Sequence, residues 1–183
     1  MRSLRPSDDT YRRILGLRAI RVFREEPLSD ADLEAILEAG RWTGSSKNRQ
    51  QWAFVVVDEP EGLERLATAG DFTEPLLGAA AAVAIVRLPG GYDFDLGRAA
   101  QNMMLAAAAR GVASCPITLH HTERAHDILG IPPEHHCRFA VALGYPDTDR
   151  IPDALRAARE RGLSGRRPLR ELAHRGTFGT PWQ

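Results

Sequence analysis

The sequence has few of the features that mark specialised classes of protein. Its 183 residues include two cysteines, Cys115 and Cys137, which are too few for a disulfide framework and favour a reducing compartment. The N-terminal stretch has no apolar segment of the signal-peptide kind. The most apolar run, Leu76–Val86, has about half of the ~20 residues that cross a bilayer. We therefore expect a cytoplasmic protein that has no membrane partner.

The chain also has no excess of positive or negative charge. The 24 acidic and 24 basic residues balance, and Lys47 is the one lysine among the basic residues. No stripe of alternating basic and aromatic residues is present, which argues against a nucleic-acid-binding module. The glycine-rich dinucleotide fingerprint, the P-loop, the zinc-protease helix motif and the serine-hydrolase elbow are absent as well. We therefore do not expect a Rossmann domain.

Histidines gather in one region of the chain. His120, His121, His126, His135 and His136 lie with Cys137 within 18 residues. Their spacing matches neither the C-x₂-C nor the H-x₃-H pattern of zinc sites. We expect a polar loop and helix surface here and no metal site, with a metal site as the less favoured alternative.

Helical and strand patterns alternate along the chain without strict βαβ regularity, which predicts a single α+β domain over 1–183 with a central sheet. Residues 1–10 are expected to be flexible, and residues 165–183 to form a tail that packs on its own subunit or on a partner. Ser29 is a predicted helix N-cap with an acid three residues later. Residues 52–58 are apolar on both faces, which favours a central strand. The other expected helices cover residues 11–17, 61–70, 94 or 95 to 110, 122–130 and 153–162, and the other expected strands 81–87, 112–117 and 138–146.

Hydrogen-bonding side chains stand directly before the first strand, in "GSSKNRQQW" (Gly44–Trp52). Two arginine pairs, Arg18 with Arg21 and Arg166 with Arg167, add fork-shaped donors suited to phosphate. Together these groups predict a site for a phosphorylated, hydroxyl-bearing ligand. The alternatives are solvated surface arginines and a turn whose side chains bond the local backbone.

Three segments resemble the nitroreductase family of FMN enzymes. "RAIRVF" (Arg18–Phe23) is similar to the family's R-S-x-R-x-F signature, with Ala19 in place of the serine. "GSSKNRQQW" is similar to its P-S-x-x-N-x-Q-P-W segment, and residues 95–117 to its central helix and next strand. The resemblance spans residues 11–145. It implies a three-layer fold, with a central mixed, mostly antiparallel sheet flanked by helices, in an intertwined homodimer.

The resemblance also implies roles for the polar residues. Arg18 and the backbone of Ala19 would meet the FMN phosphate, and Arg21 would lie near the pyrimidine edge of the ring, where a cation favours the reduced flavin. The polar segment would reach an FMN held mainly by the other subunit, through Ser45, Ser46 and Asn48. Arg166 and Arg167 would close the phosphate pocket.

The stretch Pro116, Ile117, Thr118 and Leu119 matches the family segment that passes the reactive edge of the flavin. Pro116 has no N–H, so Thr118 or Leu119 would donate to flavin N5. Cys115 is expected to be a small buried hydrophobic residue and not a nucleophile.

The implied activity is hydride transfer from NAD(P)H to FMN and then to a nitroaromatic, a quinone or a similar small-molecule electron acceptor. No side chain is assigned as catalytic. Flavin-consuming, dehalogenating, peptide-oxidising and non-catalytic redox-sensing roles on the same fold stay open. Residues 71–75 and 89–93 are candidates for the loop that selects the acceptor. The alanine-rich helix 96–109 is the candidate dimer contact, or otherwise a core helix.

Overall fold

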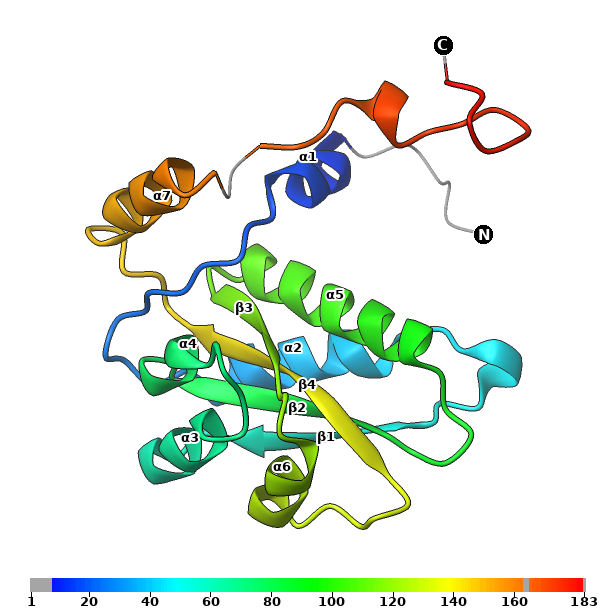
Figure 1. Ribbon diagram of the computed structural model, residues 1–183. Helices are drawn as coiled ribbons and strands as arrows, with labels where there is room; N and C mark the ends of the chain where they lie inside the picture. The colour runs from blue at the N-terminus through cyan, green and yellow to red at the C-terminus, as the bar shows by residue number, and fades with distance from the viewer. Residues whose placement is uncertain (1–7, 163–164, 183) are drawn as a thin grey trace. The chain divides into compact units, whose positions relative to one another are not determined.

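The computed structural model describes residues 8–162 and 165–182. The chain divides into two compact units, Met1–Ile151 and Pro152–Gln183, each of which is described by itself. Residues 1–7, most of the N-terminal segment expected to be flexible, lie outside the described part. Figure 1 labels the elements: α1 (Asp8–Gly16), α2 (Asp30–Arg41), β1 (Trp52–Val57), α3 (Pro60–Ala67), α4 (Glu74–Leu77), β2 (Ala81–Arg87), α5 (Asp93–Ala109), β3 (Ala113–Thr118), α6 (Thr122–Leu129), β4 (His136–Gly144) and α7 (Ile151–Glu160).

The four strands form one sheet in the order β1-β2-β4-β3. Every pairing between them is antiparallel, with Phe54 opposite Ile85 and Cys115 opposite Ala142. This arrangement confirms the predicted α+β class with a mostly antiparallel central sheet.

The position predicted for the first strand was wrong. We expected residues 52–58 in the centre of the sheet, but β1 is an edge strand that pairs, within the described residues, with β2 alone. Its apolar character has another cause. Phe54 and Val56 pack in the core on one face of the sheet, and Val55 and Val57 in the core on the other. Burial of both faces by helices does not require a strand on both edges.

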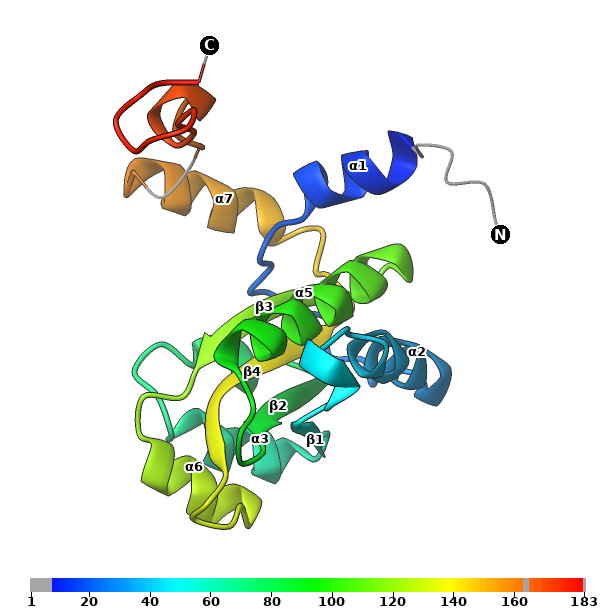
Figure 2. The ribbon, with the colours of Figure 1, turned by 90° about the vertical axis from the view of Figure 1, so that its right-hand side faces the viewer.

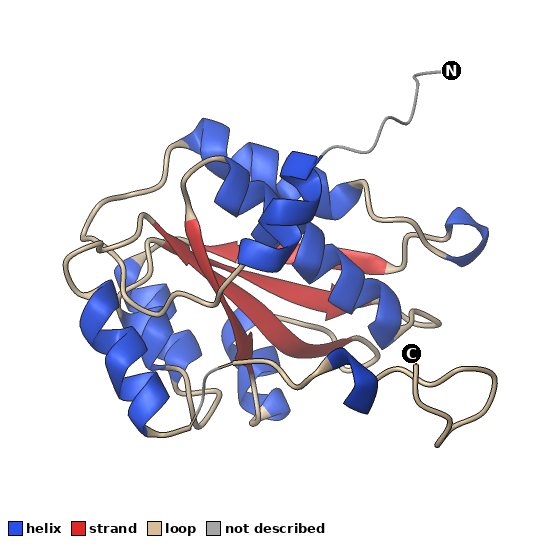
Figure 3. Ribbon diagram, turned by 90° about the horizontal axis from the view of Figure 1, so that it is seen from above, coloured by secondary structure: helices blue, strands red, loops and turns tan. Residues whose placement is uncertain are grey.

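Helices cover both faces of the sheet, which gives three layers (Figures 1, 2 and 3). Helices α2 and α5 pack on one face through a core that includes Ile36, Met103 and Val141. Helices α3, α4 and α6 lie against the other face, in a core that includes Leu66 and Ala125. The alternation of side chains along each strand therefore separates two hydrophobic cores.

The predicted helix ends mostly agree with the structure. Ser29 is the N-cap of α2, and its Oγ accepts the backbone N–H of Asp32. Gly111 follows α5 with φ of 74°, and Gly130 ends α6 with φ of 65°, a conformation that glycine adopts without strain. Helix α6 differs, because its N-cap is His121 and Thr122 is its first residue.

The second unit is small. It contains most of α7 and a 3₁₀ turn over Leu169–Glu171, and near its end His174 bridges Pro181. The guanidinium of Arg175 lies 4.5 Å from the centroid of the Trp182 ring. In the described residues of both units, no helix is long and apolar enough to cross a membrane.

Candidate functional site

The outer edge of β3 presents free backbone groups. Leu119 donates its N–H to the carbonyl of Arg138 at 2.8 Å, so the odd-numbered residues of this stretch bond to β4. In an antiparallel ladder the alternate residues point their N–H and C=O the other way. Ser114 follows this rule, because its carbonyl accepts the N–H of Ile20 at 3.0 Å on the outer side.

This alternation separates the two candidate donors in the Pro116–Leu119 segment. The N–H of Leu119 is occupied within the sheet, whereas that of Thr118 points to the outer edge. Pro116 also faces the outer edge, and a missing N–H there removes no ladder bond. Beyond Ser114, where the segment from Ile20 covers the edge, the N–H donor that the outer edge of β3 offers is that of Thr118, near the end of the strand. Ile117 is buried in the core.

The arginine signature lies beside the start of the same edge. The backbone from Ile20 to Phe23 runs from the bond with Ser114 to a bridge between Phe23 and Pro146. Phe23 is buried against Gly144, where a Cβ would come within 2.9 Å of the ring. This packing fixes the segment that carries both arginines against the sheet.

Arg18, Ala19 and Arg21 are all exposed in this segment. Arg18 donates from Nη1 to the carbonyls of Leu15 and Leu17, each at 2.7 Å. Arg18 also borders a surface cavity of about 390 Å³ between the end of α1 and the C-terminal end of α5. Its guanidinium is thus held by its own backbone at the mouth of a cavity.

Arg21 lies close enough to β3 to act on a buried thiol. Burial raises the pKa of Cys115, and the positive charge of Arg21 opposes that rise. Cys115 is 2% exposed, which confirms that it is a buried hydrophobic residue.

The polar segment before β1 is fixed at both ends. At its start, Arg98 on α5 donates from Nη1 to the carbonyl of Gly44 at 2.8 Å. One turn further along α5, Asn102 donates from Nδ2 to Oγ1 of the buried Thr43 at 2.9 Å. At its end, Gln51 donates from Nε2 to the carbonyl of Pro89 at 2.5 Å. The loop is therefore a defined structure and not a loose connection.

Within this loop the backbone adopts an unusual conformation. Lys47, Asn48 and Gln50 have φ of 53°, 53° and 51°, the left-handed region that costs a non-glycine residue roughly 1–2 kcal/mol. The Oγ of Ser45 accepts the N–H of Gln50 at 2.9 Å, so this hydroxyl does bond the local backbone. The side chains of Ser46 and Asn48 have no hydrogen-bond partner in the described part of the chain. Strain of this kind often occurs where a ligand is held.

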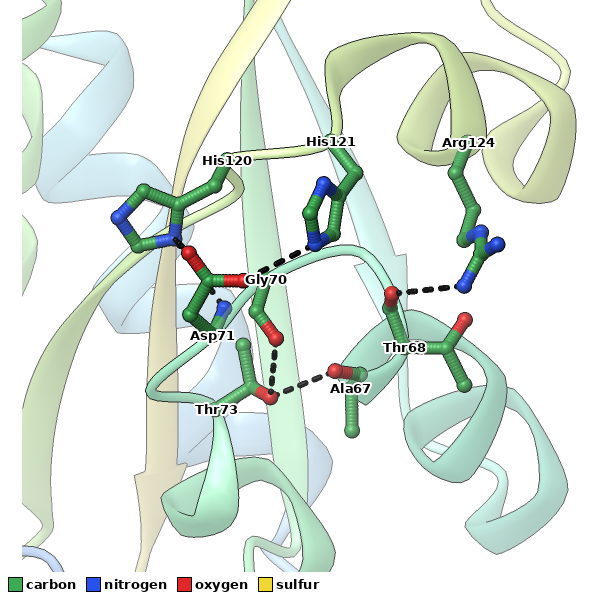
Figure 4. A network of polar contacts seen from close by, with 8 residues as sticks. All are labelled: Ala67, Thr68, Gly70, Asp71, Thr73, His120, His121 and Arg124. Carbon is green, nitrogen blue, oxygen red and sulfur yellow. Dashed lines mark hydrogen bonds and ion pairs between the residues drawn. The ribbon is translucent and has the colours of Figure 1, made fainter.

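A polar cluster that the sequence did not reveal lies beyond β3 (Figure 4). Asp71, in the loop between α3 and α4, donates its N–H to Nδ1 of His120 at 3.2 Å. Its Oδ1 lies 3.0 Å from Nε2 of His121. Thr73 donates to the carbonyl of Ala67 inside the same loop. A cavity of about 540 Å³ opens beside these histidines at the start of α6.

His120 and His121 thus serve a contact with the loop between α3 and α4. Among the described residues, no group of three or more His, Cys, Asp or Glu side chains is arranged to hold a metal ion. The one signal in the sequence was the His120-His121 pair after a strand, and the partner Asp71 is 49 residues away from His120. No local pattern predicts that pairing.

The structure brings some of the predicted site residues together. Arg21 and the stretch Pro116–Leu119 share the β3 edge, and Arg18 and Ala19 lie at its start. The polar loop precedes β1 at the opposite edge of the sheet, about 14 Å away for three strand spacings. Within one chain, the polar loop and the outer edge of β3 therefore do not meet. Arg166 and Arg167 belong to the second unit, where Arg167 pairs with Glu171 at 3.2 Å.

Comparison with known proteins identifies the fold. The model of the nitroreductase family matches residues 14–86 and 89–145. This chain belongs to the nitroreductase family. A curated protein of Archaeoglobus fulgidus, provisionally named an NADH dehydrogenase/NAD(P)H nitroreductase, is 30% identical over 154 residues, which are 78% of this chain and 88% of that protein.

Solved structures agree with this membership of the nitroreductase family. Nitroreductase A from Vibrio parahaemolyticus superposes with a TM-score of 0.81 at 24% identity, over 94% of this chain and 77% of that one. An FMN-dependent nitroreductase from Clostridium difficile R20291 gives a TM-score of 0.67 at 26% identity, over 71% and 83%. The family resemblance, the fold and the enzyme class, an oxidoreductase of the nitroreductase type, are therefore confirmed.

Proposed function

We propose that this nitroreductase-family chain is an FMN-dependent enzyme that passes hydride from NAD(P)H to a nitroaromatic, a quinone or a similar electrophile. The single observation that carries the proposal is the outward N–H of Thr118 on an edge whose start is flanked by Arg21. The NADPH:FMN oxidoreductase of Vibrio harveyi, solved with NAD⁺, supports the cofactors, with a TM-score of 0.78 at 23% identity over 93% of this chain and 78% of that one.

The described residues fit FMN. When bound, FMN supplies the hydride-accepting ring that links the two half-reactions. The Thr118 N–H would donate to ring atom N5, and Pro116 and Ile117 would form the adjoining edge, while the Leu119 N–H stays in the sheet. Arg21 would place its cation at the pyrimidine edge, where negative charge accumulates on reduction.

The phosphate end of FMN would lie at the start of the edge. The Arg18 guanidinium would exchange its bonds to Leu15 and Leu17 for the phosphate, and the N–H of Ala19 would serve in place of the family's serine. Arg166 and Arg167 would close this pocket. Fork-shaped guanidinium donors match phosphate oxygens in two-point contacts.

A second copy of the chain would complete the site. The polar loop and the β3 edge lie at opposite edges of the sheet of one chain, so Ser45, Ser46 and Asn48 would reach the flavin of the partner in a homodimer. The exposed part of α5 would form the symmetric contact. The two cysteines are free and buried, which supports a cytoplasmic location.

The absorption spectrum of the purified protein tests the cofactor. We expect bands near ~370 and ~450 nm, as for any flavin, that bleach on addition of NADH or NADPH. Arg21→Ala should slow this bleaching more than it weakens FMN retention, whereas Arg65→Ala on α3 should change neither. Steady-state NAD(P)H oxidation with menadione separates an enzyme from a non-catalytic flavin-binding protein. Protein that stays colourless and ignores added FMN would overturn the proposal.

A further inference from the structure

The ring of His120 is oriented by the main chain of the loop between α3 and α4. Its Nδ1 accepts the N–H of Asp71 at 3.2 Å, which is closer than the Asp71 carboxylate oxygen Oδ2 at 3.7 Å. A ring nitrogen that accepts a hydrogen bond carries no proton, so the neutral ring carries its proton on Nε2. Nε2 has no hydrogen-bond partner among the described residues and points away from Asp71 (Figure 4). His120 therefore presents a free N–H donor.

The loop that orients this ring is itself fixed. His121 donates its N–H to the carbonyl of Ala69 at 2.9 Å. A Cβ on Gly70 would lie 2.6 Å from the carbonyl oxygen of Thr118 and 3.4 Å from Nδ1 of His120. The loop thus packs directly against the last residue of β3 and against the histidine. The direction of the Nε2–H is set at the other ring nitrogen, where the backbone N–H of Asp71 donates to Nδ1 and Gly70 packs close by.

An exposed aromatic ring accompanies this donor. Phe72 follows Asp71, is 75% exposed, and packs edge-on against His120 with 6.0 Å between ring centroids. This exposure leaves apolar area uncovered, and a Phe side chain gains free energy when an apolar surface covers it. Thr118, whose N–H points to the outer edge, is two residues before His120. An exposed aromatic ring and a free N–H donor therefore lie next to Thr118, at the C-terminal end of the β3 edge.

We propose that Phe72 and His120 form the binding site for the electron acceptor, and that the acceptor class is aromatic compounds with a carbonyl or nitro oxygen. This inference rests on the function proposed above. Phe72 would stack on the aromatic ring, and the Nε2–H of His120 would donate to the oxygen. When the acceptor receives hydride, negative charge develops on that oxygen, and a fixed N–H stabilises it. His120 keeps the proton on Nε2, and the oxygen takes its proton from water.

Two substitutions separate hydrogen bonding from packing. His120→Leu keeps the bulk of the ring but removes the donor, and should lower kcat/KM for menadione by at least about tenfold, towards the ~10²–10³ loss found for a buried oxyanion donor. His120→Gln keeps an N–H donor and should recover most of that loss. Ferricyanide, which takes electrons without a hydrogen-bonded carbonyl, should be reduced by all variants at rates within about twofold of one another.

His121→Leu is the matched control. It removes the 3.0 Å contact to Asp71 but leaves the Nε2–H of His120 in place. Its kcat/KM for menadione should stay well above that of His120→Leu. Phe72→Ala should raise KM for menadione more than it lowers kcat, because stacking acts on the bound ground state as well. Equal losses in His121→Leu and His120→Leu would show that the two histidines only anchor the loop, and would overturn the proposal.

An NMR measurement that needs no enzyme turnover completes the test of the acceptor site. Nitrogen-15 NMR of the histidine side chains in the oxidised protein should show His120 as the Nε2–H tautomer. Menadione, added without NAD(P)H, should shift that Nε2–H signal in the wild type. An Nδ1–H tautomer, or a signal that ignores menadione while the wild type reduces it, would end the proposal and leave the proposed function intact. A wild type that holds no FMN would end both.

Discussion

Asn102, on α5, donates from Nδ2 a hydrogen bond of 2.9 Å to Oγ1 of Thr43, a buried residue 59 positions earlier in the chain. This bond ties the central helix to the start of the polar loop. Asn102→Ala would leave the Thr43 hydroxyl without that partner, so we expect a loss of about 1–3 kcal/mol in the free energy of unfolding. Urea denaturation measures this change as a lower midpoint.

A double-mutant cycle with Thr43→Val isolates the bond itself. The double variant should lose less stability than the sum of the two single variants, because the second substitution has no remaining partner to disturb. Each single variant should also bind added FMN more weakly, since the loop proposed to reach the partner's flavin loses its anchor. Strict additivity of the two losses would contradict the coupling.

Gly70 is the second position with a defined expected outcome. A Cβ there would lie 2.6 Å from the backbone oxygen of Thr118, and a backbone atom at an ordered strand end cannot give way cheaply. Gly70→Ala should therefore cost about 1–3 kcal/mol and displace the loop from His120. Gly78→Ala is the matched control, because no atom lies within 4 Å of its Cβ position. If the free energy of unfolding is the same for Gly70→Ala and Gly78→Ala, the loop can move to accommodate the added methyl group at no cost, and the prediction is wrong.

The sequence predicted what local patterns determine. The N-cap Ser29, the stop at Gly111 and the two strands around Cys115 and Val141 follow from side-chain chemistry and hydrophobic periodicity within short windows. The order of the strands does not follow from such patterns. The two apolar faces of β1 show that helices cover the strand on both sides, but they carry no information on whether another strand pairs with each of its edges. This is why a strand at the edge was predicted to be central.

The candidate site also has features that local motifs predict and features that only the tertiary structure shows. Motif spacing identified Arg18, Arg21 and the polar loop. It did not decide whether Thr118 or Leu119 supplies the outward N–H donor. The register with β4 was needed to separate them, since register depends on pairing over more than 20 residues. The contact of Asp71 with His120 depends on how a distant loop packs, which no short pattern encodes.

Asp32 provides a prediction on ionisation. Three hydrogen bonds, from Tyr145, Ser29 and Arg110 in decreasing order of effect, lower its pKa from the ordinary value of 3.8. Tyr145→Phe should therefore raise this pKa towards 3.8, and Ser29→Ala should raise it less. Carbon-detected NMR titration of the Asp32 carboxyl measures both shifts. A larger shift in Ser29→Ala would reverse the order that we expect.

The sign of the effect on stability follows from the lowered pKa. Because the folded state holds the Asp32 carboxylate more strongly than the unfolded state does, the stabilisation is present above pH 3.8 and disappears as the pH falls through the lowered value. The difference in stability between wild type and Tyr145→Phe should thus be larger at pH 7 than in strong acid. Denaturation curves at several pH values measure it.

Lys47 allows a test of whether the strain in the polar loop is functional. Its φ of 53° is unfavourable for a side chain with a Cβ, and glycine would remove a cost of about 1 kcal/mol, less the entropy that glycine adds to the unfolded chain. Lys47→Gly should therefore be as stable as the wild type or slightly more stable, yet bind FMN more weakly, because the loop would no longer be confined to one conformation. Lys47→Ala removes the same amine but keeps the strained backbone, so it should not gain stability and should retain more FMN affinity than the glycine variant. Equally weak FMN binding in the alanine and glycine variants would mean that the amine, which both lack, and not the backbone shape, matters.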